Sequence, residues 1–309
     1  MNSCPYKCDA DAVRRLAADA GATACGIAAA GPVGAEAVEQ YRRWISAGRH
    51  AAMDYMERHG ALRDDPRELF PGTRSVIVCA FNYYTDEPVA LPVALYARGM
   101  DYHYVLRQRL ESMASRLCGE YGGEARVCVD SAPLRERWWA VRAGLGFIGL
   151  NNQLIIPGRG SYFVLGVILW TGVAQTTPPL QGGDCGRCGR CVAACPAGAL
   201  DSGGAALDAR RCLSYLTIEH RGDFPPGTDL CGHLFGCDEC QRVCPHNRNA
   251  APSEIAEFHP SDEFAALGPD DVAALTSGAF KRMFRSSPIF RCRPAGLGRN
   301  LKMLYDILK

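Results

Sequence analysis

Between Cys185 and Pro196 the chain reads CGRCGRCVAACP. Three cysteines, each separated from the next by two residues, are followed by a fourth cysteine and a proline. This is the spacing of bacterial ferredoxins, in which the first three thiolates bind one [4Fe–4S] cluster and the fourth binds a second cluster. Gly186 and Gly189 let the backbone approach the inorganic sulfides, because glycine has no side chain in the way. The stretch therefore predicts a module held together by iron–sulfur clusters.

A second cysteine group, CDECQRVCP at 237–245, repeats this pattern without its first cysteine. Leu234 stands where that cysteine would be, so a second cluster needs a thiolate from elsewhere. Cys212 and Cys231 are the candidates, and we favour Cys212 because it opens a predicted helix that would hold the ligand rigidly. With the fourth cysteines exchanged as in ferredoxins, cluster one takes Cys185, Cys188, Cys191 and Cys244, and cluster two takes Cys195, Cys212, Cys237 and Cys240.

Zinc is the alternative metal, since four-cysteine zinc sites also use short spacings. Three evenly spaced cysteines followed by Cys-Pro fit zinc poorly, and the near repeat of the pattern fits it still less well. Zinc would provide stability only, whereas two clusters would also deliver electrons. Cys25, Cys79 and Cys128 lie outside both groups in apolar runs, and we expect them to be small core residues.

The composition is that of an ordinary globular protein, with 309 residues of which 48% are hydrophobic and 22% charged. Lys plus Arg number 34 and Asp plus Glu 33, so the bulk charge does not indicate a polyanion-binding protein. A chain of this length can bury a core, and its 16 cysteines are interpreted as reduced thiols rather than a disulfide scaffold. No signal peptide is apparent, and the longest apolar run, 162–174, is shorter than the about 20 residues of a spanning helix. We expect a cytoplasmic monomer without membrane contact.

The Pro- and Gly-rich stretch TTPPLQGGD at 176–184 divides the chain. Residues 1–175 are predicted to form a mixed α/β domain, 176–250 a ferredoxin-like module and 251–309 a helical segment. Within the first region, apolar residues recur at helical spacing in 101–121, and short apolar runs are typical of buried strands. Helices are expected at 9–20, 101–121 and 134–143, and strands at 24–28, 75–81, 125–129, 153–156 and 162–170.

Two clusters fused to a domain of this size indicate a redox enzyme rather than a free electron carrier. No G-x-G-x-x-G motif follows a predicted strand, so the usual sign of a nicotinamide or flavin site is missing. His103, His220 and His246 are isolated in the sequence and are interpreted as surface or hydrogen-bonded residues.

Further motifs are YMER at 55–58, YARGMDYH at 96–103, VDSAP at 129–133 with Glu136-Arg137, AGLGFIG at 143–149, SYLTIE at 214–219 and CDECQRVCPHN at 237–247. In these stretches, and over nearly its whole length, the chain resembles the epoxyqueuosine reductase family. The resemblance implies an α/β (α+β) cobalamin-binding domain carrying a ferredoxin-like module with two [4Fe–4S] clusters. It also implies that cluster two borrows a cysteine from the segment before SYLTIE, in agreement with Cys212.

The resemblance implies an oxidoreductase that reduces epoxyqueuosine to queuosine at the wobble position of tRNA anticodons, the last step of queuosine biosynthesis. Removal of the epoxide oxygen as water leaves an alkene and takes two electrons and two protons. Two clusters can pass single electrons from an external low-potential donor to base-off cob(II)alamin, whose reduced cobalt can attack a strained ring carbon. The epoxide oxygen is a poor leaving group until it is protonated, so an acid is needed nearby.

Asp130 is the catalytic candidate, because the proton donor of the family occupies this position in VDSAP. Its pKa must rise from about 3.9 if it is to hold a proton near neutral pH, and burial against the corrin would raise it. The alternative is an aspartate that caps the helix expected to start near Leu134.

Further cofactor contacts are implied by the resemblance alone, and their alternatives are core strands, salt bridges or solvated turns. Many members have Lys where this chain has Leu150 and Glu where it has Val167. If those side chains touch the cobalamin periphery or the RNA, we expect the cofactor affinity or the substrate range of this chain to differ from theirs. Besides Asp130, the implied cofactor contacts are Arg58, Tyr96, Ala97, Asn152, Gln153, Leu154, Ile156, Pro157, Ser214, Asp238 and Glu239.

Seven basic residues and no acidic residue lie between Lys281 and Tyr305. This stretch fits phosphate contacts to a tRNA anticodon stem-loop, and a solvated helical face is the alternative. Corrinoid reductive dehalogenases share the plan of cobalamin with two clusters and are the nearest competing enzymes. A two-cluster electron-transfer protein and a zinc-stabilised RNA-binding module are the competing non-enzymes.

Overall fold

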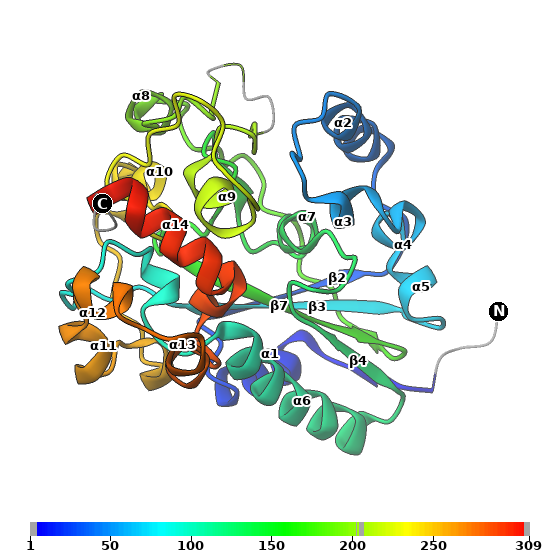
Figure 1. The fold of residues 1–309 in the computed structure, drawn as a ribbon. Helices are drawn as coiled ribbons and strands as arrows, with labels where there is room; N and C mark the ends of the chain where they lie inside the picture. Colours follow the sequence, from blue (N-terminus) through cyan, green and yellow to red (C-terminus); the bar gives the residue numbers. More distant parts are fainter. Residues whose placement is uncertain (1–4, 202, 204–206, 306–309) are drawn as a thin grey trace.

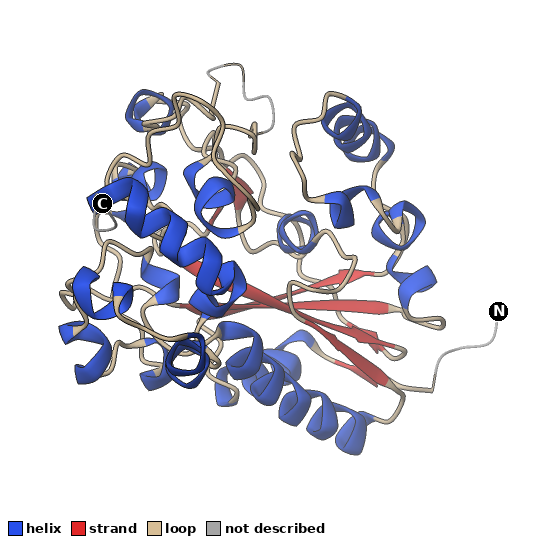
Figure 2. Ribbon diagram, viewed as in Figure 1, coloured by secondary structure: helices blue, strands red, loops and turns tan. Residues whose placement is uncertain are grey.

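The centre of the molecule is a four-stranded sheet in the order β2 (Ala24–Ala29), β3 (Ser75–Asn82), β7 (Phe163–Trp170) and β4 (Ala125–Cys128) (Figure 1). The computed structural model describes residues 5–201, 203 and 207–305, so parts of the predicted regions at both ends lie outside it. All neighbouring strands of this four-stranded sheet are antiparallel. Helices and loops surround the sheet (Figure 2), which is why β3 is an unbroken apolar run rather than an alternating one.

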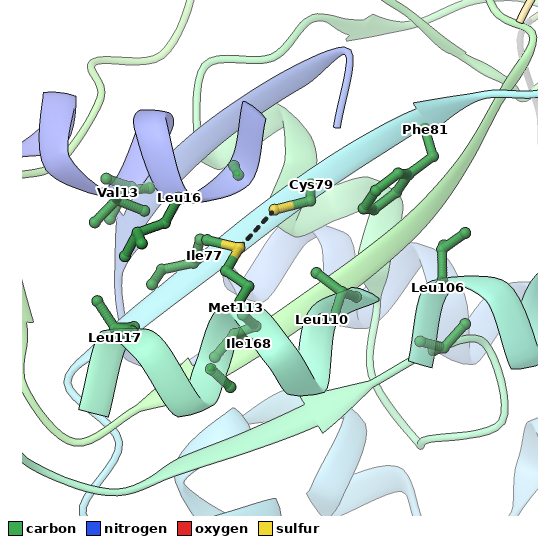
Figure 3. Packing of buried hydrophobic residues seen from close by; sticks show 14 of the residues in the cluster. Val13, Leu16, Ile77, Cys79, Phe81, Leu106, Leu110, Met113, Leu117 and Ile168 are labelled. Atoms are coloured by element: carbon green, nitrogen blue, oxygen red, sulfur yellow. Dashed lines mark hydrogen bonds between the residues drawn. The ribbon is translucent and has the colours of Figure 1, made fainter. Parts of the chain in front are cut away.

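Helices α1 (Ala10–Asp19) and α6 (Tyr102–Tyr121) cover one face of the sheet. Asp101 caps α6 by accepting the backbone N–H of His103 at 2.9 Å. Figure 3 shows the inner side of α6 packed against the sheet, and the helical spacing of its apolar residues confirms the prediction for 101–121. Its fully buried side chains here are Leu106, Leu110, Met113 and Leu117.

The opposite face of the sheet is covered by α7 (Glu136–Arg142), whose Trp139 is buried there. A Cβ at Gly26 would stand 2.1 Å from the carbonyl oxygen of Ala143, so this glycine lets the end of α7 lie directly on β2. Between β2 and β3 the chain forms α2 (Ala35–Ser46), α3 (Asp54–Glu57), α4 (Gly60–Asp64) and α5 (Pro66–Leu69).

In the part of the chain that the structure describes, two small strand pairs lie outside the central sheet. The strand predicted at 153–156 is shorter than expected, and β6 (Leu154–Ile155) pairs only with β5 (Phe147–Ile148) in a hairpin. The other pair joins β1 (Lys7–Cys8) to β8 (Val173–Ala174) in parallel. Within the described residues, no helix has the length and apolar character that crossing a membrane would require.

The cysteine-rich module docks on one end of the sheet through buried polar contacts. Gln241 donates a hydrogen bond to the hydroxyl of Tyr83, just after β3, at 2.8 Å. The backbone N–H of Ser161, just before β7, donates to Asn247 Oδ1 at 2.7 Å. The apolar core of the module itself is small, consisting of Ala209, Leu213, Tyr215 and Leu216. Its helices are α8 (Arg190–Ala194), α9 (Leu213–Ile218), α10 (Glu239–Arg242) and the 3-10 turn η2 (Pro245–Asn247).

The C-terminal residues are helical, as predicted, and pack back on the cysteine-rich module. The buried side chain of Asn300 donates to the carbonyl oxygens of Thr217 at 2.8 Å and Leu234 at 2.9 Å. A third apolar core forms here with residues of the loop that follows β3, which contains η1 (Leu95–Ala97). The elements are η3 (Ala256–Phe258), α11 (Asp262–Ala266), α12 (Pro269–Ala273), α13 (Ser277–Phe284), η4 (Pro288–Cys292) and α14 (Arg293–Tyr305).

Candidate active site

Four cysteines of the predicted first set line one cavity. Cys191 lies in α8, and Cys244 directly precedes η2. The loop before α8 has positive φ at Gly186 (66°) and Gly189 (73°), and no atom lies within 4 Å of the place of a Cβ at either residue. This backbone leaves room for a bulky group beside it. The cavity is lined by Cys185, Cys188, Cys191 and Cys244, together with Leu150, Asn151, Ile155, Gly189 and Pro245.

The predicted second set gathers where α9 and α10 begin. Cys212 is the N-cap residue of α9, as the sequence suggested, and Cys240 lies in α10. Burial raises the pKa of the Cys240 thiol, and the neighbouring Cys237, Cys212 and Cys195 raise it further. Cys212 therefore stands among these thiols, whereas Cys231 is exposed.

The two sets are chemically suited to iron–sulfur clusters. Buried thiols with raised pKa values become thiolates when a bound metal supplies compensating positive charge. Among the described residues, no three His, Cys, Asp or Glu side chains are placed to hold a single metal ion. In a [4Fe–4S] cluster each thiolate binds a different iron, so the ligands surround a cube instead of converging on one atom.

Asp130 follows β4 at the end of the sheet where the cysteine-rich module docks. Its φ is 50°, in the left-handed region that aspartate adopts more readily than most residues. Its backbone N–H donates to Glu136 Oε1 at 2.7 Å, while its side chain remains 58% exposed. Because α7 begins at Glu136 with Arg135 as its N-cap residue, the alternative that Asp130 caps this helix is wrong.

His103, in the first turn of α6, joins Asp130 to Asp101. Its Nδ1 lies 2.7 Å from Asp101 Oδ1, and its Nε2 lies 3.1 Å from Asp130 Oδ2. Burial lowers the pKa of His103, but the hydrogen bonds to the two carboxylates outweigh burial and raise it to about 9. Sequence reasoning missed this contact, because no spacing rule links positions 103 and 130. The one local signal was the helix-capping aspartate two residues before His103.

The pKa of Asp130 is lowered in this structure. Burial raises it, but the hydrogen bond and charge of His103, the hydrogen bond of Tyr102 and the charge of Arg291 together outweigh burial. The hypothesis that burial against the corrin raises this pKa stays a prediction, and the side chains around Asp130 act on its pKa in the opposite direction. The adjacent His103 is the group that holds a proton at neutral pH.

Glu136 and Arg137 lie in the first turn of α7, near Asp130. Burial, followed by the charge of Asp130, raises the pKa of Glu136 to about 8. The guanidinium of Arg137 donates to the carbonyl oxygen of Asn152, which itself has a positive φ of 61°. The hairpin loop that carries Asn152 is thereby held beside Asp130.

Tyr96 and Asp238 connect this region to the second cysteine set. The Tyr96 ring packs edge-on against Tyr102, with centroids 6.1 Å apart, and burial together with the charges of Asp238 and Asp130 raises the pKa of its hydroxyl. Asp238, between Cys237 and α10, accepts the backbone N–H of Leu95 at 2.7 Å. A group bound between Asp130 and Asp238 would therefore stand next to both the acid–base residues and the cysteines.

An ion pair borders Asp130 on the side of the C-terminal segment. Arg291 donates through Nε and Nη2 to both oxygens of Glu219, at 2.9 and 3.0 Å. Its guanidinium lies 5.9 Å from the ring centroid of Tyr55, which is 42% exposed. Asp130 affects the pKa of both Tyr55 and Arg291, so the three residues lie near one another. We call the surface formed by Tyr55, Asp130 and Arg291 the recess. Sequence reasoning did not connect them, since they come from three distant segments.

The other residues implied as cofactor contacts differ widely in exposure. Ala97 belongs to the third apolar core, and Leu154 and Ile156 to the core under α7, so their side chains are committed to packing. Arg58 and Pro157 are exposed, Gln153 and Ser214 are half-buried, and Glu239 pairs with Arg242 and His233.

The two departures from the family pattern have different surroundings. Leu150 lines the cavity of the first cysteine set. Val167 is fully buried in the centre of β7 and packs in the core under α7, where a charged side chain would need a partner. The Val167 side chain therefore serves the packing of the sheet and is not exposed to a cofactor or to RNA.

The basic C-terminal residues are of two kinds. Arg299 donates to the carbonyl oxygens of Leu216, His220 and Gly222, and its guanidinium lies 4.0 Å from the ring centroid of Phe224. It therefore joins α14 to the module. The exposed basic residues of the segment are Lys281, Arg282, Arg285, Arg291, Arg293 and Lys302.

Two protein-family models match the chain. The model described as "Epoxyqueuosine reductase QueG, DUF1730" matches residues 63–131, and the model described as "4Fe-4S double cluster binding domain" matches residues 184–247. The second range includes both predicted cysteine sets. An epoxyqueuosine reductase of Leadbetterella byssophila is 36% identical over 305 residues, which cover 96% of this chain and 98% of that protein.

Solved structures share the fold. A crystal structure of epoxyqueuosine reductase with an epoxyqueuosine-modified tRNA-Tyr stem loop has a TM-score of 0.86 and 26% identity, covering 95% of this chain and 80% of that one. A reductive dehalogenase structure concerned with B12-dependent dehalogenation has a TM-score of 0.51 and 16% identity, covering 95% of this chain and 37% of that one. The second likeness is one of fold alone.

Proposed function

The chain belongs to the epoxyqueuosine reductase family, and from this we infer that it is an oxidoreductase that reduces epoxyqueuosine in tRNA to queuosine. In this reaction two electrons and two protons enter, the epoxide oxygen leaves as water and an alkene remains. The observation that carries the proposal is the position of Asp130, a 58% exposed carboxylate whose charge acts on Tyr96 together with that of Asp238, the neighbour of Cys237 in the second cysteine set. Proton supply and electron supply therefore meet at one recess.

The cofactors are two [4Fe–4S] clusters and cobalamin. When bound, reduced cobalamin supplies a nucleophilic cobalt for the strained carbon of the epoxide. The small apolar core of the cysteine-rich module supports the clusters, because such a module needs metal to hold it together. We assign Cys185, Cys188, Cys191 and Cys244 to cluster one, and Cys195, Cys212, Cys237 and Cys240 to cluster two.

The corrin is assigned to the space between Asp130 and Asp238. Arg137 holds the loop of Asn152 through the carbonyl oxygen of Asn152, and the charges of Asp130 and Asp238 both act on Tyr96. The side chains of Leu154 and Ile156 stay in the core, so the hairpin contributes shape and backbone groups there. Of the contacts implied from sequence, Arg58, Gln153, Pro157, Ser214 and Glu239 are assigned to the corrin periphery.

The substrate is assigned to the open side of the recess, next to Tyr55 and Arg291. The tRNA anticodon stem-loop would lie across the exposed basic residues, while the modified wobble nucleotide enters unstacked, as enzymes acting on a base require. Tyr55, with 42% of its surface exposed beside a guanidinium, offers a ring on which a base can stack.

The test is anaerobic purification with quantitation of iron and cobalamin, followed by reduction of a stem-loop that bears the epoxide nucleoside. We expect about eight irons and one cobalamin per chain, and conversion of the epoxide to the alkene detected by mass spectrometry of the nucleosides. Zinc in place of iron, or an epoxide left intact with both cofactors loaded, would contradict the proposal. An organohalide serves as the competing substrate, since a dehalogenase would turn it over without RNA.

A further inference from the structure

We propose that Asp101, His103 and Asp130 form a proton relay, in which His103 supplies the proton that Asp130 passes to the substrate oxygen. This inference rests on the proposed function and extends it to a second residue. Asp130 is the catalytic residue because it faces the substrate recess, whereas His103 and Asp101 act through it as positioning residues. We call Asp101, His103 and Asp130 the relay.

The relay is continuous in the structure. Asp101 Oδ1 lies 2.7 Å from His103 Nδ1, and Asp130 Oδ2 lies 3.1 Å from His103 Nε2. Asp101 also accepts the backbone N–H of His103 at 2.9 Å, so one carboxylate fixes both the backbone and the ring of this residue. The backbone N–H of Asp101 donates to the carbonyl oxygen of Ser286 at 2.7 Å. The relay is thus held in place before any substrate arrives.

The direction of proton transfer follows from exposure. The side chain of Asp130 is 58% exposed and borders Tyr55 and Arg291, and the side chain of His103 is 34% exposed, so the imidazole ring can be reprotonated from water. Asp101 is only 19% exposed and has the imidazole as its neighbour. A proton therefore enters at His103 and leaves at Asp130.

The reaction balances through this route. The His103 imidazolium first gives its Nε2 proton to the Asp130 carboxylate. When the first C–O bond of the epoxide breaks, its electron pair goes to oxygen, and the oxygen takes this proton from Asp130, which returns to the carboxylate. The neutral imidazole then takes a proton from water. Cleavage of the second C–O bond uses the same route again, so that water leaves and the alkene remains. The two electrons come from the external low-potential donor of the proposed function.

Other charged and titratable groups surround Asp130 and set the pH dependence with it. His103 remains protonated up to about pH 9, because two carboxylates outweigh the effect of burial on its pKa. Its raised pKa means that the proton is present below pH 9 and is lost as the pH rises through that value. The groups that face Asp130 are Tyr102 and His103 from α6, Glu136 and Arg137 from α7, Tyr55 from α3, Tyr96 from η1 and Arg291 from η4.

Three variants test the relay in the holoenzyme. D101N removes the charge behind His103 but leaves an asparagine, which caps a helix as well as aspartate does. H103Q keeps a polar side chain that cannot carry the proton. H259Q is the matched control, because His259 Nδ1 also pairs with a carboxylate, Glu87 Oε1 at 2.5 Å, outside the relay and the recess.

The first measurement is kcat for the epoxide-bearing stem-loop from about pH 6 to about pH 10. For the wild type we expect kcat to fall as the pH rises through about 9. D101N should move this fall to lower pH by about one unit or more, because His103 loses an adjacent opposite charge. H103Q should lower kcat by about 10²-fold with little change in KM, and should abolish the fall near pH 9. H259Q should match the wild type.

The second measurement is an NMR titration of histidine-labelled holoenzyme, with H103Q used to identify the signal. We expect His103 to titrate near pH 9 in the wild type and at lower pH in D101N and D130N. A wild-type pH profile and kcat in H103Q, or titration of His103 near its ordinary pKa, would overturn the relay. A wild type that leaves the epoxide intact, while His103 still titrates near 9, would instead reject the proposed function and keep the three-residue pairing.

Discussion

Asp130 has a left-handed backbone conformation, and its carboxylate pairs with the imidazole of His103. Its φ of 50° costs little for aspartate or asparagine and more for alanine, so D130N is the clean test of its chemistry. Because asparagine cannot pass on a proton, we expect D130N to lower turnover by at least about 10²-fold while iron and cobalamin contents stay at wild-type levels. Turnover is measured on the epoxide-bearing stem-loop. Full activity of D130N would show that another group delivers the proton.

Glu136 gives a separate, pH-dependent prediction at the same scale. Burial and then the charge of Asp130 raise its pKa in the folded state from 4.5 to about 8. A raised folded-state pKa means that its contribution to stability is complete below pH 4.5 and is lost as the pH rises through 8. Glutamine at this position still accepts the N–H of Asp130 and carries no charge. Relative to the wild type, E136Q should therefore gain thermal stability between about pH 5.5 and about pH 8.5.

The measurement for E136Q is the difference in Tm between variant and wild type, taken anaerobically at both pH values. The control is E57Q, which makes the same substitution at an exposed glutamate of α3. A constant Tm difference for E136Q would show that Glu136 is ionised in the folded protein at neutral pH.

Some residues of the site could be predicted from the sequence, and others could not. Asp130 could be named because a motif surrounds it, and the cysteine sets because their spacing reflects cluster geometry. His103 lay in a quoted motif but was taken as isolated, because its partner is 27 residues away. The pKa of Asp130 was expected to rise, since burial could be anticipated from sequence but the imidazole beside it could not.

At the scale of elements, the long periodic segments were predicted well and the short ones less well. The range 101–121 became α6 because apolar residues recur on one side, and 75–81 became β3 because an apolar run is buried by both layers. The hairpin of β5 and β6 was not anticipated, since two-residue strands have no detectable period. That hairpin matters because it borders both the first cysteine set and the recess at Asp130.

The contact between the module and the sheet gives a prediction at this scale. Asn247 accepts the N–H of Ser161 at 2.7 Å and donates to the carbonyl oxygen of Gln241 at 2.8 Å, and it is buried. N247A should leave these groups unpaired and destabilise the protein by about 1–3 kcal/mol. Because the module would then sit less firmly on the sheet, electron delivery should slow as well. N249A, at an exposed asparagine two residues on, is the control.

The two readouts for N247A are thermal unfolding of the holoprotein and the rate of single-turnover reduction. If N247A lowers neither Tm nor this rate relative to N249A, the buried asparagine does not fix the module.

At the scale of the whole molecule, the C-terminal segment serves both the fold and the substrate. Its α14 is tied to the module by Asn300, and its η4 places Arg291 beside Asp130. Ser286 accepts the backbone N–H of Asp101, so the same segment also holds the relay. Sequence reasoning saw one basic stretch with two alternatives, phosphate contacts or a solvated face. The sequence does not reveal that Arg299 donates its hydrogen bonds to carbonyl oxygens inside the protein.

This division of the basic residues predicts opposite results for two arginines. Arg285 is exposed and adjoins Ser286 at the edge of the relay, so R285A should weaken stem-loop binding and reduce the slope of log K against log salt by about one. Arg299 holds three carbonyl groups of the module, so R299A should lower Tm and leave the salt slope unchanged. Binding is measured by fluorescence anisotropy over a salt series. Binding with one phosphate contact fewer releases fewer counterions and so has a smaller salt slope. Equal salt slopes for R285A and the wild type would therefore show that Arg285 does not contact the RNA, and would place the RNA on another face.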